Sequence, residues 1–117
     1  MEKFEGDFVN WTSVQEAFGK GYIGYGGGLD VPEPDNLIVA DYQIDGYEGD
    51  ANVLWRNDDG TFGYVSGGHC SCYGLEDQWE VEELTKEMIE KLIEANEKWS
   101  WSFWNRFADG IKEAIAA

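Results

Sequence analysis

Apolar residues recur with the spacing of one helical face at the start of the chain. A period of three to four residues is typical of an amphipathic helix. Ser13, followed three residues later by Glu16, matches a capping box, and Gly19 is a favourable residue for ending a helix. We therefore predict a short helix over residues 13–18. The apolar positions in this pattern are Phe4, Phe8, Trp11, Val14 and Phe18.

The middle of the chain alternates between strand-like segments and turn residues. Residues 37–44, 51–56 and 61–66 are rich in β-branched, aliphatic and aromatic residues, which favours strands. The first segment begins with an uninterrupted apolar run, which indicates burial on both faces. A loop over 45–50 and an Asp-Gly turn within 57–60 separate the strands, and such short connections predict an antiparallel meander.

The C-terminal third returns to helical spacing. Asp77 and Glu80 match a helix N-cap and its third helical residue, so we predict a helix over 78–96. A second helix over 101–116 follows, with Gly110 as its weakest point. The apolar stripe of the first helix consists of Val81, Leu84, Met88, Leu92 and Ala95, widened by Ile89 and Ile93.

Together these elements predict one α+β domain over residues 1–117. Its sheet is a three-stranded antiparallel meander, and the alternative is a four-stranded sheet in which residues 22–25 form an edge strand. A short N-terminal helix precedes the meander, and two C-terminal helices pack on one of its faces.

Six glycines fall within residues 19–28. Residues 19–24 match the G-x-G-x-x-G pattern of nucleotide-binding loops, but no strand precedes them and no helix follows, as that motif requires. We predict a loop in which glycine permits positive φ angles or close backbone packing. A small-ligand pocket between this loop and the His-Cys segment described below is a third functional hypothesis.

Charge restricts the kind of partner. The formal net charge is −16, from 24 acidic and 8 basic residues, and such a surface repels phosphate backbones. We predict no direct nucleic-acid binding and a protein partner with a basic surface, although a high charge also serves solubility.

The N-terminal residues lack a signal-peptide pattern, and no apolar run is long enough for a membrane span. We predict a cytoplasmic protein with reduced thiols and no membrane association.

The chain's only histidine and both cysteines lie together, as His69, Cys70 and Cys72. Three soft donors within four residues do not have the paired spacing of structural zinc sites, and a complete ligand set would need Glu76 or Asp77, or a second chain. Cysteine catalysis is also disfavoured, because adjacent residues on an extended backbone point to opposite faces. A disulfide between cysteines two residues apart would be strained.

The structural interpretation of this segment is that Gly67 and Gly68 bend the chain out of the third strand. Leu75 then fills the core and Asp77 caps the following helix. We predict no catalytic residue, no metal and no cofactor. The alternative function is a metal- or thiol-dependent module centred on His69, Cys70 and Cys72.

Residues of the same segment and two tryptophans near the C-terminus are the binding candidates. Trp99 and Trp101 are expected to cover the end of the sheet, with an aromatic patch for a partner or a homodimer as the alternative. The candidate binding residues are His69, Cys70, Cys72, Tyr73, Glu76, Trp79, Trp99 and Trp101.

Residues 47–51, the hairpin after them and residues 68–79 resemble a family of small uncharacterised proteins of phages and prophages. The most specific part is the string His-Cys-Ser-Cys-Tyr-Gly-Leu-Glu at residues 69–76, and the resemblance covers residues 37–85. It implies no activity and no catalytic residue. It does imply a context, because small acidic phage proteins are often inhibitors or accessory factors that bind a host protein.

Overall fold

The computed structural model describes residues 1–19, 29–70 and 74–117. The predicted strand over 22–25, the glycine-rich loop after Gly19, Cys72 and Tyr73 therefore lie outside the described residues. The strands are β1 (Phe4–Gly6), β2 (Leu37–Asp45), β3 (Glu48–Arg56), β4 (Phe62–His69) and β5 (Glu82–Leu84). The helices are α1 (Trp11–Gly19), α2 (Lys86–Ala95), α3 (Phe103–Arg106) and α4 (Ala108–Ala116).

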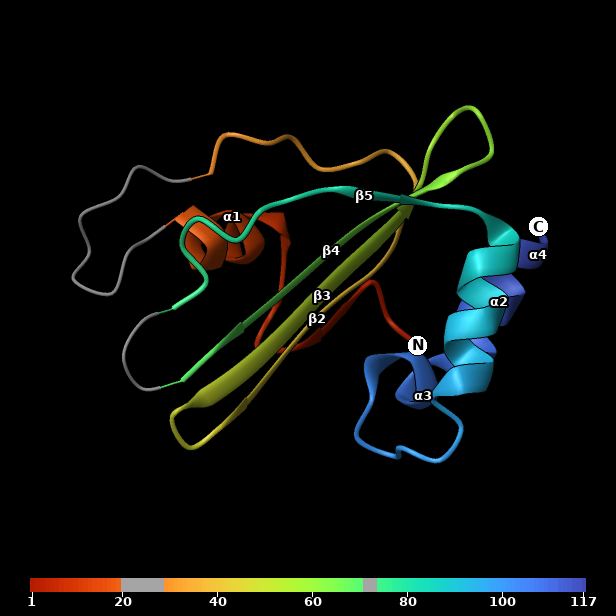
Figure 1. Cartoon of the computed structure of the whole chain (residues 1–117). Coiled ribbons are helices and arrows are strands. Elements are labelled where there is room, and N and C mark those ends of the chain that lie inside the picture. Colours follow the sequence, from red (N-terminus) through yellow and green to blue (C-terminus); the bar gives the residue numbers. More distant parts are fainter. Residues whose placement is uncertain (20–28, 71–73) are drawn as a thin grey trace.

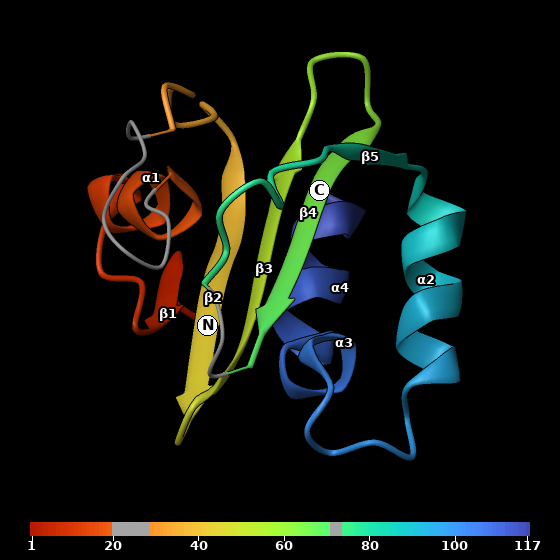
Figure 2. The same cartoon turned by 60° about the vertical axis from the view of Figure 1, so that its left-hand side comes forward.

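The strands form one sheet in the order β1-β2-β3-β4-β5 (Figure 1). All neighbours are antiparallel except β1 and β2, which are parallel. Helix α1 covers one face of the sheet, and α2, α3 and α4 cover the other (Figure 2). The α+β class, the antiparallel meander β2-β3-β4 and the placement of the C-terminal helices on one face are thus confirmed.

The predicted number of strands is wrong, because two short strands extend the meander at its edges. Phe4 of β1 pairs with Ala40, and Leu84 of β5 pairs with Phe62. Each edge strand has only three residues. Segments this short carry no periodicity of their own, and their backbone hydrogen bonds depend on a partner elsewhere in the chain.

Helix α1 begins two residues earlier than predicted, because the cap is Asn10 and not Ser13. The Asn10 Oδ1 atom accepts a hydrogen bond from the Ser13 backbone N–H at 2.9 Å. The Ser13 Oγ atom accepts one in return from the Asn10 N–H at 3.2 Å. This is a reciprocal capping box in which Ser13 is the third helical residue.

The helix predicted over 78–96 is wrong in its first half. Residues 82–84 are β5, and α2 begins only after Thr85, whose Oγ1 accepts a hydrogen bond from the Met88 N–H at 3.2 Å. Asp77 caps no helix and has a φ of 63°. Apolar residues on both sides of Thr85 keep helical spacing across the junction, so the period does not reveal where the strand ends.

The apolar stripe of this helix is also shifted from its predicted position. Ile89 and Ile93 face the core, whereas Val81 and Met88 are exposed. The predicted second helix is interrupted at Phe107, whose φ and ψ are −110° and 18°, and it forms α3 and α4. Gly110 lies inside α4 and does not break it.

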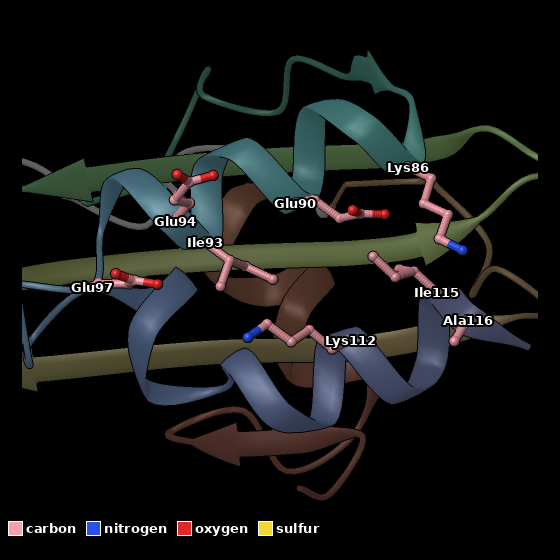
Figure 3. Close-up of a pocket in the computed structure, with 8 residues that line it drawn as sticks. All are labelled: Lys86, Glu90, Ile93, Glu94, Glu97, Lys112, Ile115 and Ala116. Atoms are coloured by element: carbon pink, nitrogen blue, oxygen red, sulfur yellow. The ribbon is translucent and has the colours of Figure 1, made fainter.

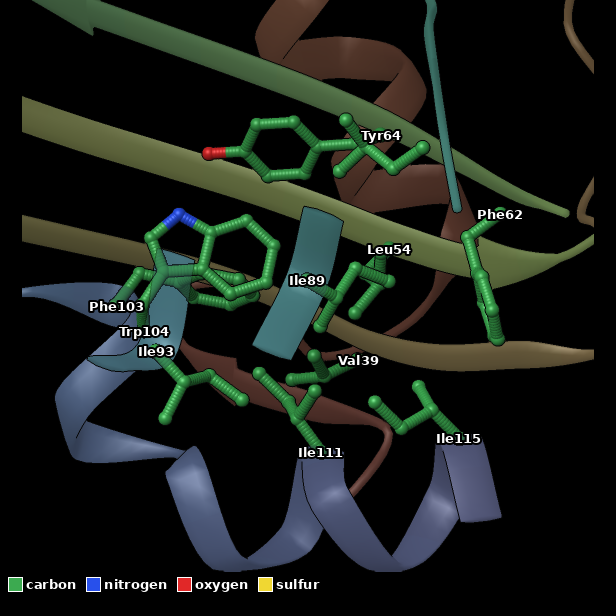
Figure 4. Close-up of a cluster of buried hydrophobic side chains, with 11 residues drawn as sticks. Val39, Leu54, Phe62, Tyr64, Ile89, Ile93, Phe103, Trp104, Ile111 and Ile115 are labelled. Carbon is green, nitrogen blue, oxygen red and sulfur yellow. The ribbon is translucent and has the colours of Figure 1, made fainter. Parts of the chain in front are cut away.

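Two apolar clusters, one on each face of the sheet, make up the core. The cluster under the C-terminal helices is shown in Figure 4. Its buried members are Val39, Leu54, Phe62, Tyr64, Leu84, Ile89, Ile93, Phe103, Trp104, Ile111 and Ile115. The cluster under α1 contains Phe8, Trp11, Val14, Phe18, Leu37, Ala40, Ala51, Val53, Val65 and Leu75. No helix in the described part of the chain is long and apolar enough to cross a bilayer.

Strand β4 continues through Gly67 and Gly68 to His69, so the predicted bend at these glycines is wrong. Glycine serves a different purpose in this sheet, which is to make room for a ring on the neighbouring strand. Trp55 of β3 is directly opposite Gly63 of β4, and its indole ring lies across that glycine. Covering a glycine with a cross-strand aromatic ring is a recognised device for stabilising sheets.

Replacing Gly63 by alanine should lower the free energy of unfolding by about 1–3 kcal/mol, the usual cost of overpacking. A Cβ atom at this position would lie 2.1 Å from the Trp55 ring, so the ring must move off the strand. Gly68→Ala is the matched control on the same strand, since its nearest atom is a backbone oxygen at 3.5 Å. Urea denaturation of both variants tests this, and equal stabilities would contradict it.

Candidate functional site

A pocket of about 570 Å³ opens where the β2–β3 hairpin, the end of β4 and the segment before α3 meet. We call it the hairpin pocket. It is more open to solvent than a buried cavity, and its wall includes three acidic side chains, Asp45, Glu48 and Asp50. The lining residues are Gln43, Asp45, Glu48, Gly49, Asp50, His69, Cys70, Trp101 and Arg106.

A partly buried ion pair lies at the pocket, with Arg106 lining it and Asp41 buried. The Asp41 side chain on β2 is fully buried, and one of its carboxylate oxygens accepts a hydrogen bond from the Arg106 Nη2 atom at 2.9 Å. The other oxygen accepts one from the Gln43 Nε2 atom at 2.7 Å. A buried carboxylate requires such partners, because its desolvation is otherwise too costly. The pair joins the central sheet to α3.

Arg106 also fixes the segment that carries the exposed tryptophans. Its Nε atom donates a hydrogen bond to the Trp101 carbonyl oxygen at 3.1 Å. One residue later, the Ser102 Oγ atom donates to the Asn96 Oδ1 atom at 2.9 Å, and Asn96 in turn donates to the Leu92 carbonyl at the end of α2. The connection between α2 and α3 is therefore tied to the core on both sides.

The two tryptophans on this connection face solvent. Trp101 is 71% exposed and Trp99 is 51% exposed, and their ring centroids lie 6.1 Å apart. The prediction that they cover the end of the sheet is wrong, because Phe103 and Trp104 take that buried position instead. Trp101 alone of the exposed pair lines the hairpin pocket.

Acidic side chains lie on the wall of the pocket that the β2–β3 hairpin forms. Asp45 and Glu48 are directly opposite each other in the β2–β3 register, next to the hairpin turn at Gly46 and Tyr47. Like charges in this position repel each other. Burial raises the pKa of the nearby Asp50 carboxyl above its ordinary value, although the hydrogen bond from Asn52 partly offsets this.

Tyr64 on β4 continues the hydrogen bonds that reach Asp50 through Asn52. The Tyr64 hydroxyl donates a hydrogen bond to the Asn52 Oδ1 atom, which leaves the Asn52 amide nitrogen to donate to Asp50. Burial is the main cause that raises the pKa of Tyr64 above its ordinary value. The Tyr64 hydroxyl therefore stays protonated and acts as a hydrogen-bond donor at neutral pH.

His69 is fully engaged with its neighbours. Its Nδ1 atom lies 3.0 Å from the Cys70 carbonyl oxygen, which can only accept, so Nδ1 carries the proton. The Nε2 atom is hydrogen-bonded to the Tyr42 hydroxyl at 2.6 Å. The ring lies over Gly49, where a Cβ atom would be 2.2 Å from Nε2. This geometry makes His69 a structural part of the pocket wall.

The geometry gives no support to the metal- or thiol-dependent module. Both ring nitrogens of His69 are occupied, and the Cys70 thiol is exposed. Among the described residues, no three His, Cys, Asp or Glu side chains are grouped to hold a metal ion. Cys72, which this hypothesis also needs, lies outside the described residues.

The remaining predicted binding residues lie elsewhere. Glu76 accepts a hydrogen bond from the Gly74 N–H at 2.9 Å within its own loop. Trp79 lies on the α1 face, where its ring stacks on Trp55 with centroids 6.0 Å apart and also contacts Trp11 edge-on. The structure thus brings His69, Cys70 and Trp101 together at one pocket and separates Glu76 and Trp79 from it.

Sequence reasoning missed Asp41, Arg106, Asp45 and Glu48 as parts of this site. One signal was present, since Asp41 interrupts an otherwise apolar strand, and a buried acid requires a cationic or hydrogen-bonding partner. The sequence does not show which of its basic residues is that partner.

A second groove, of about 490 Å³, runs between α2 and α4 (Figure 3). Its floor is apolar and its rim carries charges of both signs. The lining residues are Lys86, Glu90, Ile93, Glu94, Glu97, Lys112, Ile115 and Ala116. Because the rim carries both positive and negative side chains, it favours neither a cationic nor an anionic ligand.

The fold and the pocket define a small α+β protein with an acidic, aromatic surface site. No protein-family model, no curated protein and no solved structure gives a significant match to this chain. The resemblance to phage proteins therefore stays a prediction.

Proposed function

We propose that this chain is a non-enzymatic binding protein that recognises a basic surface on another protein. The observation that carries the proposal is Trp101, a 71% exposed indole held on a hydrogen-bonded connection beside an acidic wall. An exposed tryptophan adds little to folding, whereas tryptophan is enriched among the residues that dominate binding energy. Fixing its backbone beforehand reduces the entropy lost on binding.

The overall charge supports the same partner chemistry. A net charge of −16 accelerates association with a basic protein and repels nucleic acid. The phage-like motif adds a context, in which the protein acts in the cytoplasm as an inhibitor or accessory factor on a host protein. A homodimer through the tryptophans is the alternative, but it would bring two strongly acidic surfaces together.

Capture from a bacterial lysate by the immobilised chain tests the proposal, with Trp99→Ser/Trp101→Ser as a matched bait of unchanged charge. We expect a basic protein that the wild-type chain retains at low salt and releases at high salt, and that the double variant captures poorly. Proteins that adhere through charge alone will bind both baits equally. Recovery of only these proteins would contradict the proposal, and a dimer in sedimentation velocity that the double variant abolishes would favour the homodimer.

A further inference from the structure

We propose that the hairpin pocket receives a single arginine side chain from the basic partner, with Trp101 against the guanidinium plane and Asp45 and Glu48 as its acceptors. This inference rests on the proposed function and specifies the chemistry that the site recognises. The pocket, of about 570 Å³, has the size of a typical small-ligand site and has room for one long side chain.

Asp45 and Glu48 lie at the hairpin end of the pocket. Asp45 and Glu48 face each other across the hairpin, and neither forms an ion pair with a basic side chain among the described residues, where Arg106–Asp41 is the ion pair found. Two adjacent carboxylates at the rim therefore repel each other until a cation lies between them. A guanidinium group offers five N–H donors in a planar fork and can bind both carboxylates at once.

Arg106 does not fill this role, although it lines the pocket. Its Nη2 atom is committed to the buried Asp41 carboxylate, and its Nε atom is committed to the Trp101 carbonyl. Its charge is therefore paired with Asp41, and its Nε atom fixes the backbone position of Trp101. The negative charge of the pocket comes from Asp45, Glu48 and Asp50.

Trp101 favours arginine over lysine. An indole ring is the strongest aromatic partner for a cation, and a planar guanidinium can stack on it while its edge still donates to carboxylates. A lysine ammonium group is more strongly hydrated and cannot make both contacts in one plane. We therefore expect the site to prefer a basic segment that contains arginine.

Titration of the ¹⁵N-labelled full-length chain with the blocked peptide Gly-Gly-Arg-Gly-Gly tests this inference, with Lys and Gln versions for comparison. We expect the Arg peptide to shift the backbone amides of Gly46 and Gly49 and the indole N–H of Trp101 in a saturable manner. The Lys peptide should bind more weakly, and the Gln peptide should cause no shift. Trp101→Ala should weaken the affinity for the Arg peptide about threefold to tenfold. Trp99→Ala, outside the pocket, should change this affinity less than twofold.

A charge-matched pair of variants separates the pocket from the general acidic surface. Asp45→Asn/Glu48→Gln and Asp58→Asn/Glu113→Gln remove the same number of charges, but only the first pair lies in the pocket. If both double variants lose Arg-peptide binding equally, or if the shifts spread over the whole surface, the pocket is not the arginine site. The proposed function would still hold in that case. If no basic peptide binds and no basic protein is captured, both proposals fail.

Discussion

Replacing Arg106 by methionine should lower the free energy of unfolding by about 3–5 kcal/mol, the usual cost of leaving a buried charge without its partner. The Asp41 carboxylate is fully buried, and without Arg106 the one side-chain hydrogen bond that it keeps to the described residues is from Gln43. Methionine retains much of the apolar length of arginine, so the loss reports on the charge more than on packing. Urea denaturation measures the effect.

The double variant Asp41→Leu/Arg106→Met should be less destabilised than Arg106→Met alone, because it leaves no charge unpaired. Lys112→Met is the control for losing a positive charge at an exposed site, and it should change stability by less than about 0.5 kcal/mol. If the double variant is as unstable as the single one, the ion pair is not what holds α3 on the sheet.

Replacing Leu75 by alanine should cost about 2–5 kcal/mol, as for other large-to-small changes in a core. Leu75 lies within residues 74–81, which precede β5 and form no helix or strand, yet it is only 1% exposed and is part of the cluster under α1. In the same segment, Gln78 binds the Gly68 N–H and the Gly74 carbonyl. We infer that Leu75 anchors this segment to the sheet.

Val81→Ala is the matched control, since it removes an aliphatic side chain from the same segment at a position that is 53% exposed. We expect it to change the free energy of unfolding by less than about 0.5 kcal/mol. Near-ultraviolet circular dichroism should also change in Leu75→Ala, because Trp79 lies four residues away in the stacked cluster with Trp55. An unchanged spectrum and a loss below about 1 kcal/mol would show that Leu75 is not an anchor.

The central part of the fold follows from local pattern, and its edges do not. The strand predicted over 37–44 is observed as β2, since a continuous apolar run is a strong signal. β1 is a three-residue strand paired with a distant partner, so nothing near it in the sequence identifies it. The predicted helix over 78–96 is longer than α2 because Leu84 is a buried apolar residue at a position that fits the helical period. It lies on strand β5 instead.

The candidate site shows the same division. His69 and Cys70 were recognisable as unusual residues, and they do line the pocket. Their chemistry could not be deduced, since the role of His69 depends on Tyr42, which lies on another strand. The exposure of Trp101 is fixed by the hydrogen bonds of Arg106 and Ser102, which composition does not reveal.

The order of strands in the sheet has a consequence for how the molecule assembles. From β2 to β4, neighbours in the sheet are also successive in the chain and are joined by hairpins, so each pairing closes a short loop at a small entropic cost. We expect this meander to form early, and the parallel pairing of Phe4 with Ala40 and the docking of α3 to follow. Because one wall of the hairpin pocket belongs to the meander and the other to the connection before α3, the pocket is complete only after this last docking step.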